Sequence, residues 1–309
     1  MGDEHRTAGD LQKLVPSSEL KALRRRQDRA GLMFLGGHVL TLLVTSFLLI
    51  GSHGSPWLIP AMFVHGVVIV HLFAPFHEAT HGTAFRTRWL NRMVAWITGL
   101  ALQLPPTHFT LEHAAHHKYT QDPVRDPERV PEANSIKGYL IFATAIPYFR
   151  GNIANLFNHA CGRFSPMEET FIPPNSFKKV QHEAWIIWST YGVILFLSLA
   201  LQSWFAVVYW LLPRVIGEPV MRVIRMSEHG ACPLVPDMLR NTRTVLTWRP
   251  LRWLNWNNAH HAEHHAMPAI PFHALPKLHD HLGSHIEEVR QGYVDTQAHL
   301  WRRAAEQRG

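Results

Sequence analysis

The stretch Gly31–Ile50, GLMFLGGHVLTLLVTSFLLI, contains twenty residues and no formal charge. At the helical rise of about 1.5 Å per residue, it is long enough to cross the hydrocarbon core of a bilayer. A second uncharged stretch, Trp57–Phe76, follows after a short linker that contains Gly and Ser. The two stretches therefore predict a transmembrane helical hairpin. Because a run of arginines at 24–26 precedes it, the positive-inside rule places residues 1–30 in the cytoplasm as an N-terminal arm.

A third apolar stretch, Trp185–Pro213, is long for one crossing and short for two complete ones. If histidine clusters on either side of it form one site, the chain crosses the membrane an even number of times between them. We therefore predict a second hairpin, which gives an all-α membrane protein with four transmembrane helices as two hairpins. The predicted spans cover residues 31–50, 57–76, 185–201 and 204–224. A water-soluble protein with buried core helices is the alternative.

Residues 31–309 are expected to form a single membrane domain. Its cytoplasmic helical cap, which would hold the histidine-rich site for two metals, is predicted to comprise residues 77–184 and 225–309. The apolar segments inside this cap are too short to span a bilayer and are expected to be interfacial or cap helices.

Histidine is unusually abundant, with 23 residues among 309, as many as Asp and Glu together. Histidine is the commonest metal ligand among side chains, so this excess indicates metal binding. The two cysteines, Cys161 and Cys232, are too few and too far apart for a disulfide framework or a zinc knuckle. The net charge of +7 fits contact with an anionic membrane surface. No nucleic-acid-binding motif accompanies this charge, so nucleic acid is not an expected partner.

Three histidine boxes contain the candidate ligands, and the topology places all of them on one side of the membrane. In the first box the two histidines are spaced i and i+4, so on a helix they lie on one face. In the other two boxes, both of the form HxxHH, we expect the i and i+3 pair to share a face and the last histidine to reach a second metal. Eight imidazoles exceed the roughly four ligands of one zinc site, which favours two metals. The eight are His77, His81, His113, His116, His117, His261, His264 and His265.

The three boxes resemble those of the membrane fatty acid desaturase superfamily, which also contains membrane alkane hydroxylases and carotenoid ketolases. The residues that carry the resemblance are HEATHG at 77–82, HAAHHKYTQDPVRDPE at 113–128 and HHAEHHAMPAIPFHALPKLH at 260–279. The resemblance extends from the first span to Leu282. It implies a non-haem di-iron site, O2 as co-substrate, and a ninth ligand at His229. Animal acyl-CoA desaturases have an Asn four residues before this histidine, where the present chain has Arg225.

The resemblance implies an O2-dependent oxidoreductase that acts on an alkyl or acyl chain, first of all a fatty-acyl or lipid desaturase. Hydroxylation, ketone formation and oxidative decarboxylation to a terminal alkene are alternatives within the same chemistry. Imidazole ligands also suit other metals, so iron rests on the resemblance and on the need for a redox metal at an unactivated C–H bond. Outside this chemistry, a membrane metal transporter is one alternative. A zinc protease is another, because His77–His81 matches HExxH.

Four carboxylates are expected to accept the free N–H of a ligand histidine and so fix its orientation. They are Glu78, Asp122, Asp126 and Glu263. Glu128 follows the second box as well. The alternative for the two aspartates is a solvated loop with turns at the Asp-Pro pairs. Other cap histidines, such as His108 and His279, are expected to be hydrogen-bonded residues rather than ligands.

The chain contains no electron-transfer motif, so a separate donor of the ferredoxin, rubredoxin or cytochrome type, with its reductase, is the expected partner. Six arginines are candidates for its docking surface, with contact to lipid head groups as the alternative. They are Arg222, Arg225, Arg240, Arg243, Arg249 and Arg252. The expected setting is the inner membrane of a bacterium, with membrane lipids and a lipid or fatty-acyl substrate around an active site on the cytoplasmic side.

Overall fold

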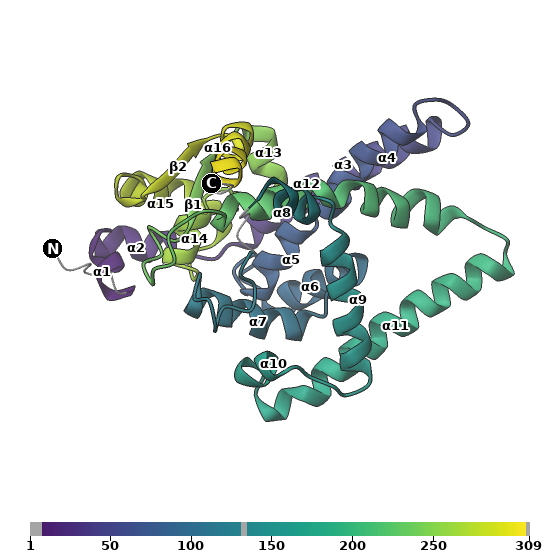
Figure 1. Ribbon diagram of the computed structural model, residues 1–309, viewed down its shortest axis with the longest axis horizontal. Helices are drawn as coiled ribbons and strands as arrows, with labels where there is room; N and C mark the ends of the chain where they lie inside the picture. Colours follow the sequence, from purple (N-terminus) through teal and green to yellow (C-terminus); the bar gives the residue numbers. More distant parts are fainter. Residues whose placement is uncertain (1–7, 131–134, 307–309) are drawn as a thin grey trace.

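The computed structural model describes residues 8–130 and 135–306, and the described chain is mostly helical (Figure 1). The first seven residues of the predicted arm, four cap residues at 131–134 and the last three residues lie outside this description. Among the described residues, three helical stretches are long and apolar enough to cross a membrane, namely Asp28–Gly51, Leu58–Thr80 and Pro174–Ala200. They correspond to the first three predicted spans, although the first is longer at both ends, the second at its C-terminal end and the third at its N-terminal end.

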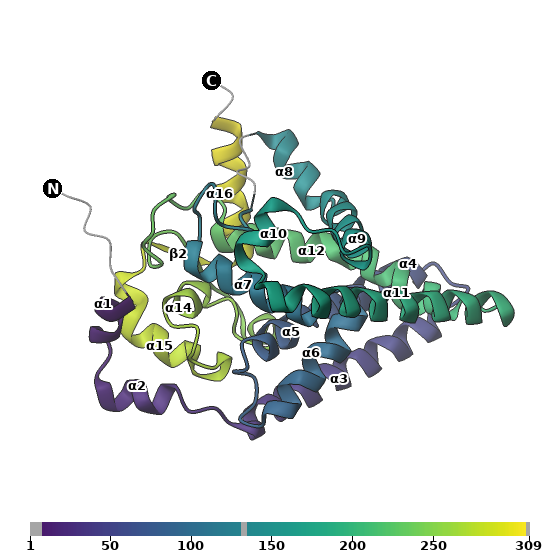
Figure 2. The same ribbon diagram turned by 90° about the horizontal axis from the view of Figure 1, so that it is seen from below.

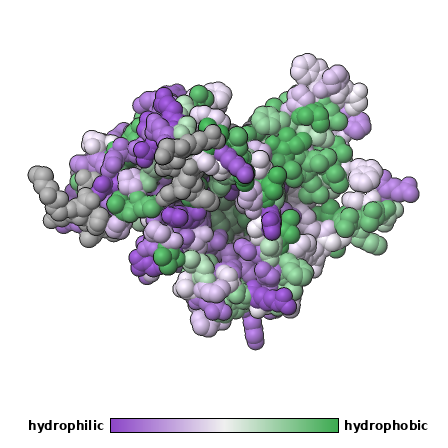
Figure 3. Space-filling model, viewed as in Figure 1, coloured by the Kyte–Doolittle hydropathy of each residue, from purple (hydrophilic) through white to green (hydrophobic). Residues whose placement is uncertain are grey.

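Helix α3 (Asp28–Gly51) and helix α11 (Phe177–Ala200) project from the body of the molecule with apolar side chains uncovered. Only 17% of the most apolar window of each span is buried, so these helices are not core helices of a water-soluble protein. Figure 3 shows the apolar surface gathered on the side where these helices project, and hydrophilic residues over the opposite side. The protein is a membrane protein.

The second span is two helices rather than one. Helix α4 (Leu58–Val70) ends at a turn formed by His71 and Leu72, and α5 (Phe73–Thr80) follows. The first histidine box therefore lies on α5 and at its C-terminal end, continuous with the membrane-spanning segment.

The fourth predicted span contains a five-residue π-helix, Val207–Leu211, followed directly by α12 (Leu212–His229). Helix α12 packs closely on α4 where Gly66 and Gly217 meet. A Cβ atom built on Gly217 would lie 2.3 Å from the carbonyl carbon of Gly66, so only glycine permits this contact. Helix α12 also carries Arg214, Glu218 and Arg222, which explains why it lacks the apolar composition of the other three.

The cap is built mainly from helices shorter than the membrane spans, and α6 and α7 contact α5. Pro106 begins α7, at a position where its missing N–H leaves no helical hydrogen bond unmade. Before and after the third span the cap helices are α6 (Arg88–Leu102), α7 (Pro106–Tyr119), α8 (Ile136–Ala143), α9 (Ile146–Ala160), α10 (Pro166–Phe171), α13 (Arg249–Leu254), α14 (His261–Ala266), α15 (Leu275–Leu282) and α16 (Tyr293–Glu306).

The cap is not entirely helical as predicted, because β1 (Arg243–Leu246) and β2 (Glu288–Gln291) form a two-stranded parallel sheet. Four residues per strand are too few to produce a readable alternation of apolar and polar residues. Arg243, the first residue of β1, is fully buried and donates to the carbonyl oxygens of Ser227 and Gly230, at 2.8 Å each. The sheet is thereby tied to the C-terminal end of α12.

The predicted N-terminal arm packs onto the cap through α1 (Ala8–Lys13) and α2 (Ser17–Leu23). Leu11 and Leu20 belong to one apolar cluster with Leu278 and Leu282 of α15 (Figure 2). A second apolar cluster, with Phe76, Phe85 and other aromatic rings, lies beneath the first histidine box. Both clusters position the segments that carry the candidate ligands.

Candidate metal centre

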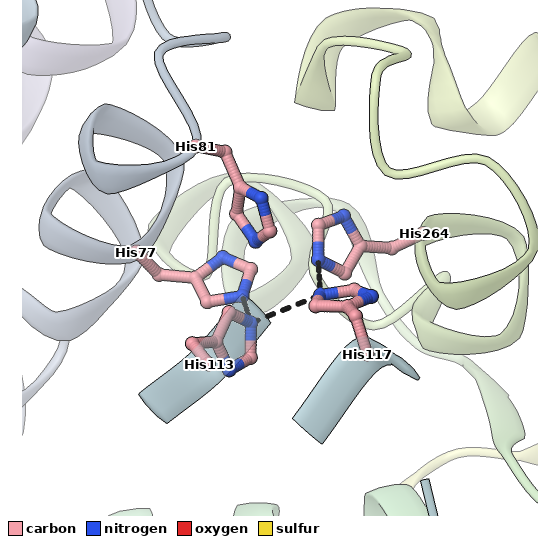
Figure 4. Close-up of side chains that lie close together, drawn as sticks. All are labelled: His77, His81, His113, His117 and His264. Carbon is pink, nitrogen blue, oxygen red and sulfur yellow. Dashed lines mark hydrogen bonds between the residues drawn. The ribbon is translucent and has the colours of Figure 1, made fainter. Parts of the chain in front are cut away.

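The structure brings all nine predicted histidines into two adjacent clusters. The first contains His77, His81, His113, His117 and His264, and the second contains His116, His229, His261 and His265. Within each cluster the ring nitrogens lie within 4.8 Å of one another. Figure 4 shows the first cluster, in which side chains from α5, α7 and α14 point toward one another. Rings of the two clusters are in contact, since His117 stacks on His265 with centroids 4.2 Å apart.

The expected division of the HxxHH boxes between two metals was wrong in detail. In the second box, His113 and His117 share the first cluster, while His116 belongs to the second. In the third box, the i and i+4 histidines belong to the second cluster and the i+3 histidine to the first. At about 100° per residue, the i+4 position lies only about 40° from i, whereas i+3 lies about 60° away on the other side. Each box therefore supplies ligands to both clusters, which holds the two clusters side by side.

The ring nitrogens of the clustered histidines face one another, as they would around a shared cation. Nε2 of His77 lies 2.7 Å from Nε2 of His113, and Nε2 of His229 lies 3.1 Å from that of His261. Two facing imidazole nitrogens share at most one proton, so a ring of them leaves lone pairs facing each other. The buried Nε2 atoms of His81 and His116 have no hydrogen-bond partner in the described structure. The donor set fits one or two transition-metal ions, iron included.

Burial keeps these imidazoles neutral. It lowers the pKa of His81 to about 3 and, together with the neighbouring histidines, lowers the pKa values of His113 and His117 well below the usual value. Burial has the same effect on the pKa of His264 and of His265. Neutral imidazole is the form that coordinates a metal, so the site is ready to bind metal at neutral pH.

Carboxylates hold two of the rings on α7. Nδ1 of His116 lies 2.7 Å from Asp126, as expected for a group that orients a ligand. Nδ1 of His113 lies 2.7 Å from Glu128, which follows the same box but was not among the four carboxylates expected to orient a ligand. The chain turns back at Gln121, where φ is 67°, and the backbone N–H of Gln121 donates to Asp126. This turn brings the acidic loop alongside α7.

The structure places Asp122 elsewhere. Its carboxylate accepts from the Arg125 side chain and from the backbone N–H groups of Val124 and Arg125. The Arg125 guanidinium lowers the pKa of Asp122 to about 2. Asp122 therefore stabilises a turn at the surface, which was the alternative to an orienting role, and its hydrogen bonds go to Val124 and Arg125 instead of to a clustered histidine.

Glu78 and Glu263 are both buried, in different surroundings. Glu78 accepts from Thr83 Oγ1 at 2.9 Å, and its other oxygen lies 3.4 Å from Nδ1 of His77. Glu263 instead binds His279 and Thr244. The nearby His260 ring, whose Nδ1 lies 3.7 Å from the carboxylate, and these two hydrogen bonds lower the pKa of Glu263 to about 2 despite its burial. Glu263, which lies within the third box, therefore anchors this box through its bonds to Thr244 and His279.

Two of the arginines considered for a donor surface are buried and paired. Arg225 donates to Glu128 at 2.7 Å and to Glu228 at 2.8 Å, and Arg243 is fully buried. Sequence reasoning missed Glu228, which precedes His229. Its Oε2 lies 3.7 Å from Nε2 of His261, and burial raises its pKa to about 7. Arg225 thus holds carboxylates that face both clusters, instead of forming part of the surface.

Two other groups of cap histidines are hydrogen-bonded, as expected. His108 and His159 both bond through Nε2 to Glu168, at 2.9 and 2.5 Å. His279 bonds to Glu263.

The fold and the site thus define a helical membrane protein with two adjacent, buried histidine clusters suited to metal ions. The sequence model of the fatty acid desaturase family matches residues 55–297. The chain therefore belongs to the fatty acid desaturase family, whose members are oxidoreductases.

Two relatives show where the similarity lies. The sphingolipid delta(4)-desaturase/C4-monooxygenase DES2 of Rattus norvegicus is 26% identical over 302 residues, which cover 93% of this chain and 87% of the relative. The sn-1 oleoyl-lipid 12-desaturase of a Picosynechococcus species is 29% identical over 79 residues, which cover 25% of this chain and 23% of that protein.

Proposed function

We propose that this protein is an O2-dependent di-iron oxidoreductase that introduces a C=C bond into the acyl or alkyl chain of a lipid. The observation that carries the proposal is the pair of adjacent buried clusters, which gather nine histidines from four segments of the chain. Membership in the desaturase family supports the reaction class. Both relatives are named as desaturases of lipids, which supports a lipid substrate.

The nine histidines would hold two irons, five residues around one ion and four around the other. When bound, the irons supply the redox chemistry with O2 that an unactivated C–H bond requires. Asp126 and Glu128 fix the rings of His116 and His113 through Nδ1, so that Nε2 faces the metal. The aromatic ring of Phe109, stacked on His113 with centroids 5.0 Å apart, covers one side of the site and excludes water.

We propose further that α12 and the preceding π-helix form a fourth crossing, which completes two hairpins. The close packing of α12 on α4 supports this arrangement. With four crossings, all nine histidines would lie on the cytoplasmic side of the membrane, which we propose is the inner membrane of a bacterium. A separate ferredoxin, rubredoxin or cytochrome would deliver electrons from that side. Arg249, which is exposed, and Arg252, which is half-buried, are among the remaining candidates for the docking surface of this donor, because Arg225 and Arg243 are buried.

Hydroxylation is the second candidate outcome, because the rat relative is named both a desaturase and a monooxygenase. The same ligands serve either outcome, and the placement of the substrate chain over the metals selects between them.

The test is product analysis with the purified, iron-loaded protein, a lipid substrate, O2 and a reducing system. We expect an alkene of unchanged carbon number, and iron at two per chain. An oxygenated chain would favour the hydroxylase, and an alkene one carbon shorter would favour the decarboxylase. Absence of iron together with absence of any O2-dependent product would refute the proposal.

A further inference from the structure

Exposed arginines lie where the first membrane span begins. Four of them precede or open α3, and three precede or lie on α6. The two groups are joined by Asp28, whose carboxylate accepts from the backbone N–H of Thr87 at 2.9 Å and from its hydroxyl at 2.7 Å. A Cβ atom built on Gly31 would lie 2.4 Å from the carbonyl oxygen of Ala84, so the two backbones are in contact as well (Figure 2). These contacts create one arginine surface, which consists of Arg24, Arg25, Arg26, Arg29, Arg86, Arg88 and Arg92.

The arginine surface has a large excess of positive charge. Asp28 is the only acidic residue in the segments 24–29 and 84–93, and Thr87 already bonds to both of its oxygens. Within residues 8–130 and 135–306, no hydrogen bond or ion pair involves the side chain of any of the seven arginines. Arg225 and Arg243 are different, since both pair with carboxylates. Because like charges repel, the arginine surface is best stabilised by anions from outside the protein.

Apolar side chains border the arginine surface. On α6, Trp89, Met93 and Ile97 follow at intervals of four residues and are 57, 39 and 59% exposed. Arg88 and Arg92 occupy the neighbouring face of the same helix. The exposed apolar face of α3 also begins directly after its arginines. Basic residues beside exposed apolar ones, with Trp at the boundary, are typical of the level of the lipid head groups.

This position selects one kind of anion. In a membrane protein the apolar stripe of α6 lies in lipid, so a water-soluble acidic protein cannot cover it together with the arginines. A phospholipid can do both, because its acyl chains cover the stripe while its phosphate reaches the charges beside it. Guanidinium groups also suit phosphate, to which they donate two parallel hydrogen bonds.

We propose that the arginine surface is a binding site for the phosphate groups of anionic phospholipids. The site would hold the start of α3 and of α6 at the level of the head groups. Since α6 contacts α5, which carries His77, the bound lipids would steady the support of the first histidine box. The seven arginines lie outside the nine clustered histidines and their carboxylates, so the inference is independent of the reaction proposed above.

The experiment measures lipid contact without turnover. The iron-loaded full chain is reconstituted in phosphatidylcholine vesicles with one of two probes: phosphatidylglycerol with a photoreactive diazirine on its head group, or phosphatidylcholine with the same diazirine. After illumination, the labelled peptides are mapped. An arginine near an anionic lipid surface strengthens binding about fivefold. We therefore expect the phosphatidylglycerol probe to label peptides that cover residues 24–33 and 86–97 at least about fivefold more than the phosphatidylcholine probe does.

The variants test whether the arginines cause this excess. Arg88→Gln combined with Arg92→Gln should lower the phosphatidylglycerol labelling at least about fivefold. Arg25→Gln combined with Arg26→Gln, in the segment between α2 and α3, should have the same effect if the first pair disturbs the helix. The matched control is Arg302→Gln combined with Arg303→Gln, two exposed positions on α16, which should label as the wild type does. Unchanged iron content would show that the fold of each variant is intact.

Three outcomes would overturn the inference. Equal labelling by the two probes would mean that the arginines do not select an anionic lipid, as expected if they served an acidic protein instead. An equal loss in the α16 control would mean that net charge alone attracts the lipid. Loss of the excess on addition of millimolar inorganic phosphate would assign the surface to a free anion.

Discussion

Glu128 links the second histidine box to α12, and its removal is the sharpest test of how the site is held. One carboxylate oxygen lies 2.7 Å from Nδ1 of His113, and the other accepts from Arg225 at 2.7 Å. Loss of a carboxylate behind a ligand histidine typically lowers metal affinity about 10- to 100-fold, which corresponds to about 1.4 to 2.7 kcal/mol. Glu128→Ala also leaves the buried Arg225 with Glu228 alone, so we expect the upper part of this range. Glu128→Gln keeps an acceptor for His113 and should fall at the lower end.

The measurement is iron affinity by competition with a chelator, together with the midpoint of thermal unfolding of each variant. Asp122→Asn is the matched control, since Asp122 follows the same box but binds Arg125 in a surface turn. We expect it to bind iron as the wild type does. If Asp122→Asn lost iron and Glu128→Ala kept it, the assignment of the ring-orienting carboxylate would be refuted.

Three other predictions follow from the site and the helix packing. His264→Ala should lose metal from the first cluster and His265→Ala from the second, each with loss of product formation; metal analysis that shows two irons in either variant would contradict the ligand assignment. Gly217→Ala should lower the free energy of unfolding by about 1 to 3 kcal/mol because the new methyl group meets the backbone of Gly66, whereas Gly36→Ala, where nothing lies within 4 Å, should have little effect in the same thermal melt. The metal-free protein should lose stability as the pH falls below about 6.5, because the unfolded chain then binds protons while burial holds the folded pKa of groups such as His81 near 3; the slope should reach at least about 1.4 kcal/mol per pH unit, and denaturant unfolding that shows no such decline between pH 7 and pH 5 would be contrary to this reasoning.

The sequence predicted the identity of the clustered histidines because helical spacing is a local property. Spacings of three and four residues place side chains near one face, and three such boxes at the ends of apolar stretches leave few ways to arrange them. The division of the histidines between two clusters was not predicted correctly, because it depends on where the facing helices lie. His264 and His265 point about 100° apart on α14. The cluster that each one joins depends on the partners it meets, which are His77 of α5 in the first cluster and His229 of α12 in the second.

The carboxylates were harder to predict, since their roles depend on how one loop folds. Asp122 and Glu128 are both carboxylates, and they follow the last histidine of the second box by five and eleven residues. The left-handed turn at Gln121 makes the difference by directing Glu128 toward His113. Arg243 illustrates the same limit: a charged residue between polar neighbours gives no sign of complete burial until β1 and β2 pair.

The glycine contact between α4 and α12 has a mechanical consequence. Helix α4 continues through a single turn into α5, which carries His77 and is followed directly by His81, and α12 ends at His229. Because the backbones of Gly66 and Gly217 are in direct contact, helices α4 and α12 form a closely packed pair that leads from the membrane to both clusters. We expect a thinner or thicker bilayer to tilt this helix pair as a whole rather than to slide one helix along the other. The spacing between the two candidate metal positions is thereby insulated from the lipid in which the protein works.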